Sequence, residues 1–322
     1  MESWKPGAIA VAAGLAAFVA GTGAETAIIR AVRGDRSALE WISDALLSAA
    51  VAALSYLWLT LKDSRTRLFD VERKAIALDE QLRLAATIQR NLLPDIPLAT
   101  DGFRWAARMV PAGQVGGDFY DFLETSADIT LVVVGDVSGK GIPAALIQSS
   151  LKALFRLIAL DTDDPAAIAE RMGSVLHGQT GGAPYATAIV LRFEHAPRRI
   201  AYVNAGHPAG LILRGTAVLP LEAGGSPLGL LPGARYGSAV LDLQPGDMGV
   251  LVTDGITEAL EGVPANVWET LRDGGDRLVE AGSPVEVCAY LLERAAKGPG
   301  PLGVEHWQDD ATVLVFRADG RP

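Results

Sequence analysis

The stretch 129-ITLVVVGDVSGKG-141 decides the fold of this chain of 322 residues. It begins with an apolar run, residues 129–135, of the kind that is typical of buried strands. Asp136 ends the run and opens a glycine-rich turn. A proline follows at position 143, a favoured first position of a helix, so we expect a helix over residues 143–160. The stretch therefore predicts a strand, an acidic turn and a helix in succession.

The same combination of strands and helices continues over residues 98–317, which we interpret as one domain. We expect further strands at residues 186–193, 199–203, 248–253 and 312–316, and further helices at residues 165–176 and 284–296. Two sets of buried strands with flanking helices favour a sandwich of the α/β (α+β) class over a doubly wound parallel sheet. Residues 318–322 follow as a tail.

Three further acidic turns lie at the ends of predicted strands. Asp118 stands in 116-GGDFYD-121, Asp254 follows the strand that ends at residue 253, and Asp309-Asp310 precede the last strand. If the last strand runs antiparallel to the other two, the carboxylates meet on one rim. An Asp-Gly pair is first of all a turn, but clustered carboxylates repel one another unless a cation lies between them. All-oxygen ligation suits Mg²⁺ or Mn²⁺ and not zinc.

The charge of the chain excludes one class of partner. Residues 1–90 hold 11 of the 28 Lys and Arg and 10 of the 38 Asp and Glu, which leaves a net charge of −11 for the remainder. No cationic excess is available there to neutralise phosphates, so we exclude nucleic acid as a partner. Cys288 is the one cysteine, which excludes a disulfide framework and a multi-cysteine metal site.

A series of short motifs runs through residues 80–317 in a fixed order. The motifs are 89-QRNLLP-94, 111-PA-112, 116-GGDFYD-121, residues 136–145, 204-NAGHP-208, 227-PLG-229, 245-PGD-247, residues 253–259 and residues 309–312. In these motifs the sequence resembles the PP2C-like (PPM) phosphatases, specifically the bacterial branch of the RsbU and SpoIIE type. The resemblance implies a β-sandwich flanked by helices, with two Mn²⁺ or Mg²⁺ ions at one end.

The resemblance also implies a role for each matched residue. Asp136 matches the aspartate that bridges both metals, and Val137 supplies a backbone carbonyl to one of them. Asp254 and Asp309 match ligands of the second metal. Asp118 matches the acidic residue on the other metal's side.

The reaction that the resemblance implies is hydrolysis of phosphoserine or phosphothreonine in a protein. Asp136 and Asp254 are expected to act through a water that bridges the metals and attacks phosphorus without a phosphoenzyme. In relatives of this branch the substrate is a phosphorylated anti-sigma-factor antagonist with a STAS fold, or a similar regulator. A non-catalytic scaffold and a membrane sensor that uses the domain for partner binding stay open as alternatives.

Four more residues are candidates for supporting roles. Asp121 and Asp310 follow the motif aspartates and are candidates for groups behind the ligands. Arg108 is a candidate for binding substrate phosphate, since a guanidinium suits phosphate. His207 is a candidate either for a general acid or for a structural loop residue.

Residues 1–61 predict a transmembrane helical hairpin. The spans 6–29 and 41–61 each contain one charged residue and reach the ~20 residues that a helix needs to cross the hydrocarbon core. Six basic residues flank the pair and three lie in the connection, which favours both ends in the cytoplasm. We therefore expect a multi-pass protein of the cell membrane with a cytoplasmic catalytic domain. A signal peptide is the alternative interpretation of the first span.

Residues 62–97 connect the hairpin to the domain. From residue 62 to residue 93 there is no Gly or Pro, and Leu, Val, Ala and Gln recur at alternating steps of three and four from Leu68 to Leu92. Such a seam predicts a parallel coiled coil, and hence a homodimer through residues 62–93. The alternative is a single amphipathic helix that lies on its own domain.

Overall fold

The computed structural model describes residues 23–34, 36–196, 198–222, 224–260, 267, 269–271, 282–297, 307 and 309–319. The chain divides into two compact units, Met1–Glu80 and Gln81–Pro322. Most of the first predicted span, residues 6–22, lies outside the described residues.

Two helices make up the described part of the first unit, α2 (Gly23–Val32) and α3 (Arg36–Asn91), and α3 continues into the second unit. The predicted second span and the predicted connecting helix are thus one helix, because no Gly or Pro interrupts it. Within the described residues one helical segment, Ser43–Asn91, is long and apolar enough to cross a membrane. This segment is weak support for membrane association, and the two-span hairpin stays a prediction.

The seam residues of α3 that precede residue 80 are exposed in the single chain. Leu68, Val71 and Leu78 keep 70%, 66% and 52% of their surface accessible to solvent. Exposed leucine and valine at this spacing are compatible with a second helix packing on them. The coiled-coil dimer stays a prediction.

The second unit is a sandwich of two antiparallel sheets, as the sequence predicts. The first sheet has the strand order β1-β2-β11-β10-β7-β8, and the second sheet has the order β3-β4-β5-β6-β9. The strands of the first sheet are β1 (Ala99–Thr100), β2 (Phe103–Val110), β7 (Gly210–Arg214), β8 (Ala217–Leu221), β10 (Met248–Val252) and β11 (Ala311–Ala318). Those of the second sheet are β3 (Phe119–Ser126), β4 (Ile129–Val137), β5 (Ala186–Glu194), β6 (Arg199–Ala205) and β9 (Ala239–Asp242).

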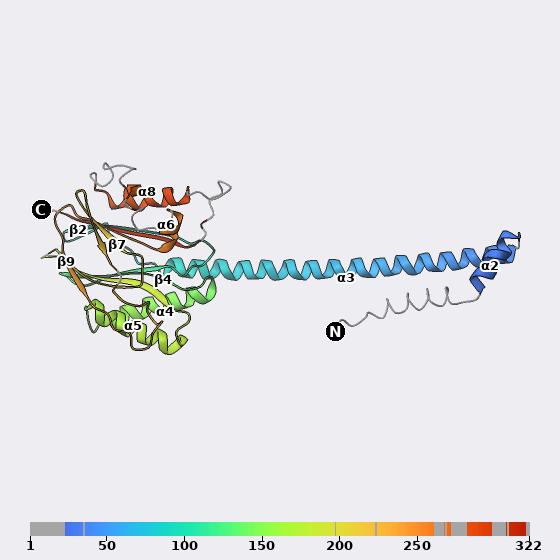
Figure 1. Ribbon diagram of the computed structural model, residues 1–322, viewed down its shortest axis with the longest axis horizontal. Helices are drawn as coiled ribbons and strands as arrows, with labels where there is room; N and C mark the ends of the chain where they lie inside the picture. The colour runs from blue at the N-terminus through green and yellow to red at the C-terminus, as the bar shows by residue number, and fades with distance from the viewer. Residues whose placement is uncertain are drawn as a thin grey trace. The chain divides into compact units, whose positions relative to one another are not determined.

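Helices cover the outer faces of the sandwich (Figure 1). Helices α4 (Ile142–Ile158) and α5 (Pro165–Thr180) pack on the second sheet. Helices α6 (Asp254–Ala259) and α8 (Pro284–Ala296) pack on the first sheet. The order of layers is therefore helix, sheet, sheet, helix.

Strand β4 shows why its sequence is apolar throughout. Val132 and Val134 point into the core between the two sheets, whereas Leu131 and Val133 point into the core beneath α4 and α5. A strand that is buried on both faces reads as a continuous apolar run. The core between the sheets is rich in aromatic side chains, among them Trp105 and Phe193 with ring centroids 4.7 Å apart.

Candidate metal centre

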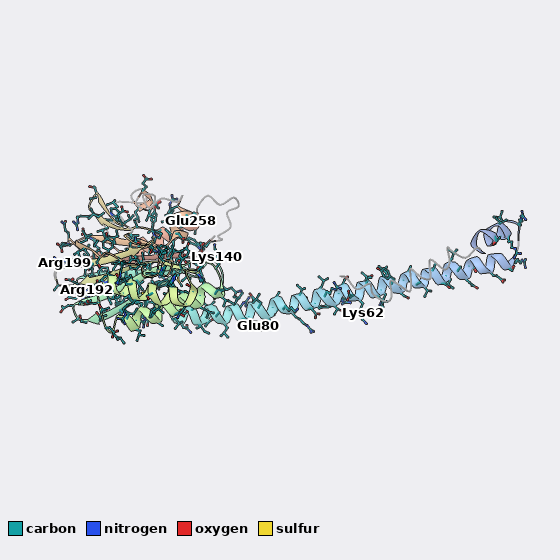
Figure 2. The ribbon with its side chains drawn as sticks, turned by 60° about the horizontal axis from the view of Figure 1, so that its bottom comes forward. Lys62, Glu80, Lys140, Arg192, Arg199 and Glu258 are labelled. Atoms are coloured by element: carbon teal, nitrogen blue, oxygen red, sulfur yellow. The ribbon has the colours of Figure 1, made fainter. Side chains whose placement is uncertain are left out.

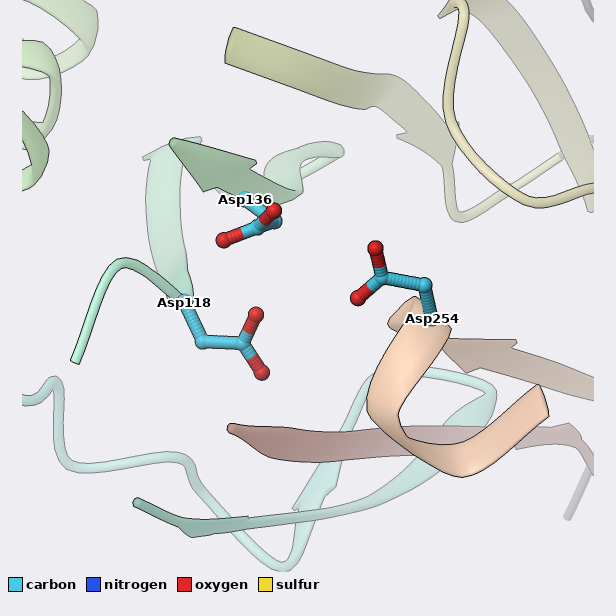
Figure 3. A group of neighbouring side chains, drawn as sticks. All are labelled: Asp118, Asp136 and Asp254. Atoms are coloured by element: carbon cyan, nitrogen blue, oxygen red, sulfur yellow. The ribbon is translucent and has the colours of Figure 1, made fainter. Parts of the chain in front are cut away.

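Three of the predicted ligands gather in one place. Asp118, Asp136 and Asp254 each offer a carboxylate oxygen, and these oxygens lie within 4.8 Å of one another (Figure 3). We call these three residues the acidic centre. Asp118 directly precedes β3, Asp136 is the last residue but one of β4, and Asp254 is the first residue of α6.

The topology explains how the acidic centre forms. Strand β11 runs antiparallel to β10, so the start of β11 lies beside the end of β10, as the sequence argument required. Strand β4 belongs to the second sheet, so Asp136 reaches the same rim from the other sheet and not through pairing of β4 with β11. The acidic centre therefore draws one carboxylate from the end of the first sheet and two from the second.

The acidic centre lies at one end of the sandwich. Lys140 and Glu258, which follow Asp136 and Asp254 by four residues each, lie at the same end of the unit in Figure 2. Arg192 and Arg199 lie at the opposite end.

Asp118 is the most buried member of the acidic centre. Its side chain is 1% exposed, and burial raises its pKa well above the usual range. The Oδ2 atom accepts hydrogen bonds from the hydroxyls of Thr253 and Thr312, at 2.7 Å and 2.6 Å. Among the described residues, none donates a hydrogen bond to Oδ1. A buried carboxylate oxygen without a donor is the feature that a bound cation would satisfy.

The pKa values of the other two carboxylates of the acidic centre are also raised. Burial, followed by the charges of Asp254, Asp309 and Asp310, raises the pKa of Asp136 to about 7. Burial and the nearby charges of Asp309 and Glu258 raise the pKa of Asp254 as well. Each of these effects disfavours the ionised form, and a cation among the carboxylates would reverse it.

A glycine keeps space open beside the acidic centre. A Cβ atom at Gly117 would lie 2.7 Å from the Val137 carbonyl oxygen and 3.0 Å from Asp136 Oδ1. A larger residue would therefore fill the space in front of the carbonyl that is predicted to bind a metal. The carboxylates and this carbonyl form an all-oxygen set, which fits Mg²⁺ or Mn²⁺.

Asp309 and Asp310 have different environments. The Oδ2 atom of Asp309 forms an ion pair with Lys140 Nζ at 2.8 Å, so this carboxylate is not part of the acidic centre. Asp310 accepts hydrogen bonds from the backbone N–H groups of Ala112 and Gly117, at 2.8 Å and 2.7 Å. Asp310 thus holds the loop that carries Asp118.

Asp121 and Arg108 are not members of the acidic centre. Asp121 is fully buried on β3 and pairs with the guanidinium of Arg156 on α4 at 2.7 Å, which joins the helix to the sheet. Arg108 is exposed on β2, on the same side of the strand as Ala106, which packs against the cluster that includes α8.

His207 fits the structural alternative. It is 4% exposed, and its backbone N–H and Nδ1 form hydrogen bonds with Asn204 Oδ1 and Thr187 Oγ1, respectively. Burial lowers its pKa to about 3, so the ring is neutral at pH 7. A neutral ring has no acidic proton to give at that pH, which argues against a general acid.

Three residues of the site were not singled out for it from the sequence. Thr253 and Thr312 reach Asp118, and Gln89 donates from Nε2 to the carbonyl of Gly116 at 2.7 Å. Gln89 is 6% exposed and its side chain bonds within the second unit, so little of it is left for a partner helix. The signal in the sequence was that Gln89 is a polar residue within an apolar repeat.

Comparisons with known proteins show the family of the chain. Residues 126–319 match the family described as Stage II sporulation protein E (SpoIIE). The chain is 28% identical over 183 residues to the phosphoserine phosphatase RsbU of Bacillus subtilis, covering 56% of this chain and 54% of RsbU. It is 30% identical over 184 residues to the phosphoserine phosphatase RsbP of the same organism, covering 55% of this chain and 45% of RsbP. The chain spans about half the length of these curated relatives.

A solved structure supports the fold over a longer range. The SiaA-PP2C domain of Pseudomonas aeruginosa superposes with a TM-score of 0.65 and 26% sequence identity. The match covers 76% of this chain and 98% of the SiaA domain.

Proposed function

This chain belongs to the SpoIIE family of PP2C-type phosphatase domains, and we propose that it is a metal-dependent protein serine/threonine phosphatase. The observation that carries this proposal is the acidic centre, in which three carboxylates from the two sheets lie within 4.8 Å of one another. A scaffold that only binds partners has no need of such a repulsive cluster, because its charges destabilise the domain unless a cation is bound.

The chain's own residues would hold two divalent cations. Asp136 would be shared by both cations, Asp118 and the Val137 carbonyl would help to hold one of them, and Asp254 would help to hold the other. Asp309 would join Asp254 once its ion pair with Lys140 opens. When bound, a cation pair lowers the pKa of a water to near neutrality and neutralises charge on the phosphate.

The site has open space beside the predicted ligands. The space in front of the Val137 carbonyl is open because residue 117 is glycine. The carboxylates would stay ionised to hold the cations, and none of them is expected to become phosphorylated.

We propose a phosphorylated STAS-type anti-sigma-factor antagonist, or a similar regulator, as the substrate. The support is the similarity to RsbU and RsbP, both named phosphoserine phosphatases. Their matched regions cover about half of each protein, so the assignment rests on the phosphatase domain alone.

The N-terminal part of the proposal is membrane anchorage by a hairpin, with the catalytic domain in the cytoplasm and a dimer through residues 62–93. Its support is the apolar segment within Ser43–Asn91 and the exposed apolar seam that follows. In this arrangement the membrane segment would act on the phosphatase through α3.

The test is phosphate release by the purified full chain from a panel of phosphorylated STAS proteins, with Mn²⁺ and with a chelator. We expect release from at least one member with Mn²⁺ and none with the chelator. Stable binding of these proteins without any release would instead support the scaffold.

A further inference from the structure

Two buried threonines share one oxygen of Asp118. The hydroxyls of Thr253 and Thr312 both donate to Oδ2, and both threonines are 0% exposed. The backbone N–H of Thr312 donates to the Thr253 hydroxyl oxygen at 2.9 Å. Since a hydroxyl has a single proton, the Thr253 hydroxyl accepts from Thr312 and gives its proton to Asp118.

This arrangement makes the two oxygens of Asp118 unequal. Oδ2 receives two hydrogen bonds, whereas Oδ1 receives none from the described residues and belongs to a carboxylate of the acidic centre. With a cation bound the carboxylate would be ionised, and hydrogen bonds to an ionised carboxylate are short and strong. Rotation of the carboxylate would break both bonds at once.

The threonines also connect the two sheets. Thr253 follows β10 and Thr312 lies on β11, which are neighbours in the first sheet, whereas Asp118 precedes β3 of the second sheet. The backbone N–H of Thr253 donates to the Thr312 carbonyl at 3.1 Å, so the pair is held in register. The position of Asp118 is thereby tied to the same strand ends that carry Asp254.

We infer that Thr253 and Thr312 are positioning residues that orient Asp118 as a one-oxygen ligand, through Oδ1, of the cation in the proposed phosphatase site. This inference rests on the proposed function, and it adds that the affinity for the cation depends on the two hydroxyls. Partners behind metal ligands typically change metal affinity by about 10- to 100-fold when they are removed.

The first test is Thr312→Val in the full chain, because valine has nearly the same shape and only the hydroxyl is lost. Thr253→Val is less informative, since it also removes the acceptor of the Thr312 N–H. We expect Mn²⁺ affinity, measured by calorimetry without substrate, to fall about 10- to 100-fold in Thr312→Val. Thr312→Ser and Thr253→Ser keep a hydroxyl and should bind Mn²⁺ nearly as the parent does.

A matched control separates this effect from the general loss of a buried hydroxyl. Thr130 is also 0% exposed, and its hydroxyl is hydrogen-bonded to His195 Nε2 at 2.9 Å, at the other end of β4. Thr130→Val should lower the midpoint of thermal unfolding and leave Mn²⁺ affinity unchanged. Equal losses of Mn²⁺ affinity in Thr130→Val and Thr312→Val would overturn the positioning role.

A double-mutant cycle tests whether Thr312 acts through Asp118. In an Asp118→Asn background, Thr312→Val should change Mn²⁺ affinity by much less than it does in the parent. If Thr312→Val does not fold, Thr253→Val in both backgrounds replaces it, and an equal change of Mn²⁺ affinity in the two backgrounds would overturn the inference. Hydroxyl-dependent Mn²⁺ binding in a chain that releases phosphate from no phosphoprotein would support the positioning role while contradicting the proposed function.

Discussion

The side-chain amide of Gln89 forms two hydrogen bonds with the backbone of Gly116. Its Nε2 donates to the Gly116 carbonyl at 2.7 Å, and its Oε1 accepts from the Gly116 N–H at 3.2 Å. The second Nε2 proton reaches Gln148 Oε1 of α4 at 3.2 Å. Because Gly116 lies two residues before Asp118, the end of α3 is connected directly to the loop that carries a member of the acidic centre.

The first prediction follows from this connection. Gln89→Leu should lower the free energy of unfolding by about 1–3 kcal/mol, because the buried N–H and carbonyl of Gly116 lose their partner. It should also weaken Mn²⁺ binding, because the Asp118 loop is no longer held. Urea unfolding and calorimetry measure the two effects. Gln81→Leu, at an exposed position of the same helix, is the matched control. Unchanged Mn²⁺ affinity in Gln89→Leu would show that α3 does not influence the acidic centre.

Removing one charge from the acidic centre should abolish activity and raise the stability of the metal-free domain. Asp136→Asn should abolish Mn²⁺-dependent phosphatase activity, because the predicted bridging ligand is lost. The metal-free variant should nevertheless unfold at a higher temperature than the parent, since repulsion with Asp254, Asp309 and Asp310 is relieved. Thermal unfolding and phosphate release are measured on the same samples. Asp128→Asn, in the exposed turn at the other end of β4, should change neither the unfolding temperature nor the rate of phosphate release. Near-normal turnover in Asp136→Asn would contradict the two-metal assignment.

The stability of the metal-free chain should depend on pH in a defined direction. The pKa of Asp136 is about 7 in the folded chain against an ordinary 3.8, so folding is coupled to proton uptake. The stabilisation from this group is complete below about pH 4 and is lost as pH rises through about 7. Mn²⁺ competes with the proton, so its affinity should increase over the same range. Urea midpoints from pH 5 to 8, with and without Mn²⁺, measure both trends. If the urea midpoint of metal-free Asp136→Asn depends on pH as that of the parent does, other groups cause the pH dependence.

The predicted dimer is tested in residues 62–322. Leu78→Asp combined with Leu82→Asp places charges in the seam and should produce a monomer with reduced turnover per site. Leu84 is 64% exposed and lies outside the seam, so Leu84→Asp should leave the protein a dimer in solution. Light scattering and phosphate release are the measurements. If the double variant is monomeric and retains full turnover, the helix is a spacer and not a switch.

The predicted hairpin is tested by fusion reporters. A reporter at residue 35 should lie outside the cytoplasm, and one at residue 322 should lie inside it, because the flanks hold more basic residues than the connection. The opposite pattern would separate the domain from a cytoplasmic substrate. A mature protein that begins near residue 24 would support the signal-peptide alternative.

The strands that the sequence predicts are mostly buried runs that are rich in apolar residues. Strands β4, β5, β6, β10 and β11 agree with the expected runs to within a few residues. Strands β1, β2, β3, β7, β8 and β9 were not predicted, and β3 differs from the predicted runs in having Asp121 at a fully buried position. The charge is compensated by Arg156, which lies 35 residues away in sequence, and a local pattern carries no information about such a partner.

The sequence by itself determined the acidic turns and the order of the motifs, since both are properties of neighbouring residues. The tertiary structure decided which carboxylates meet, because a strand's own pattern does not say which of two sheets it joins. It brings Asp118, Asp136 and Asp254 together and leaves Asp309 paired with Lys140. The hydroxyl partners of Asp118 lie 135 and 194 residues away along the chain. Their role arises where strands from the two sheets end side by side, and only the packed sandwich creates that proximity.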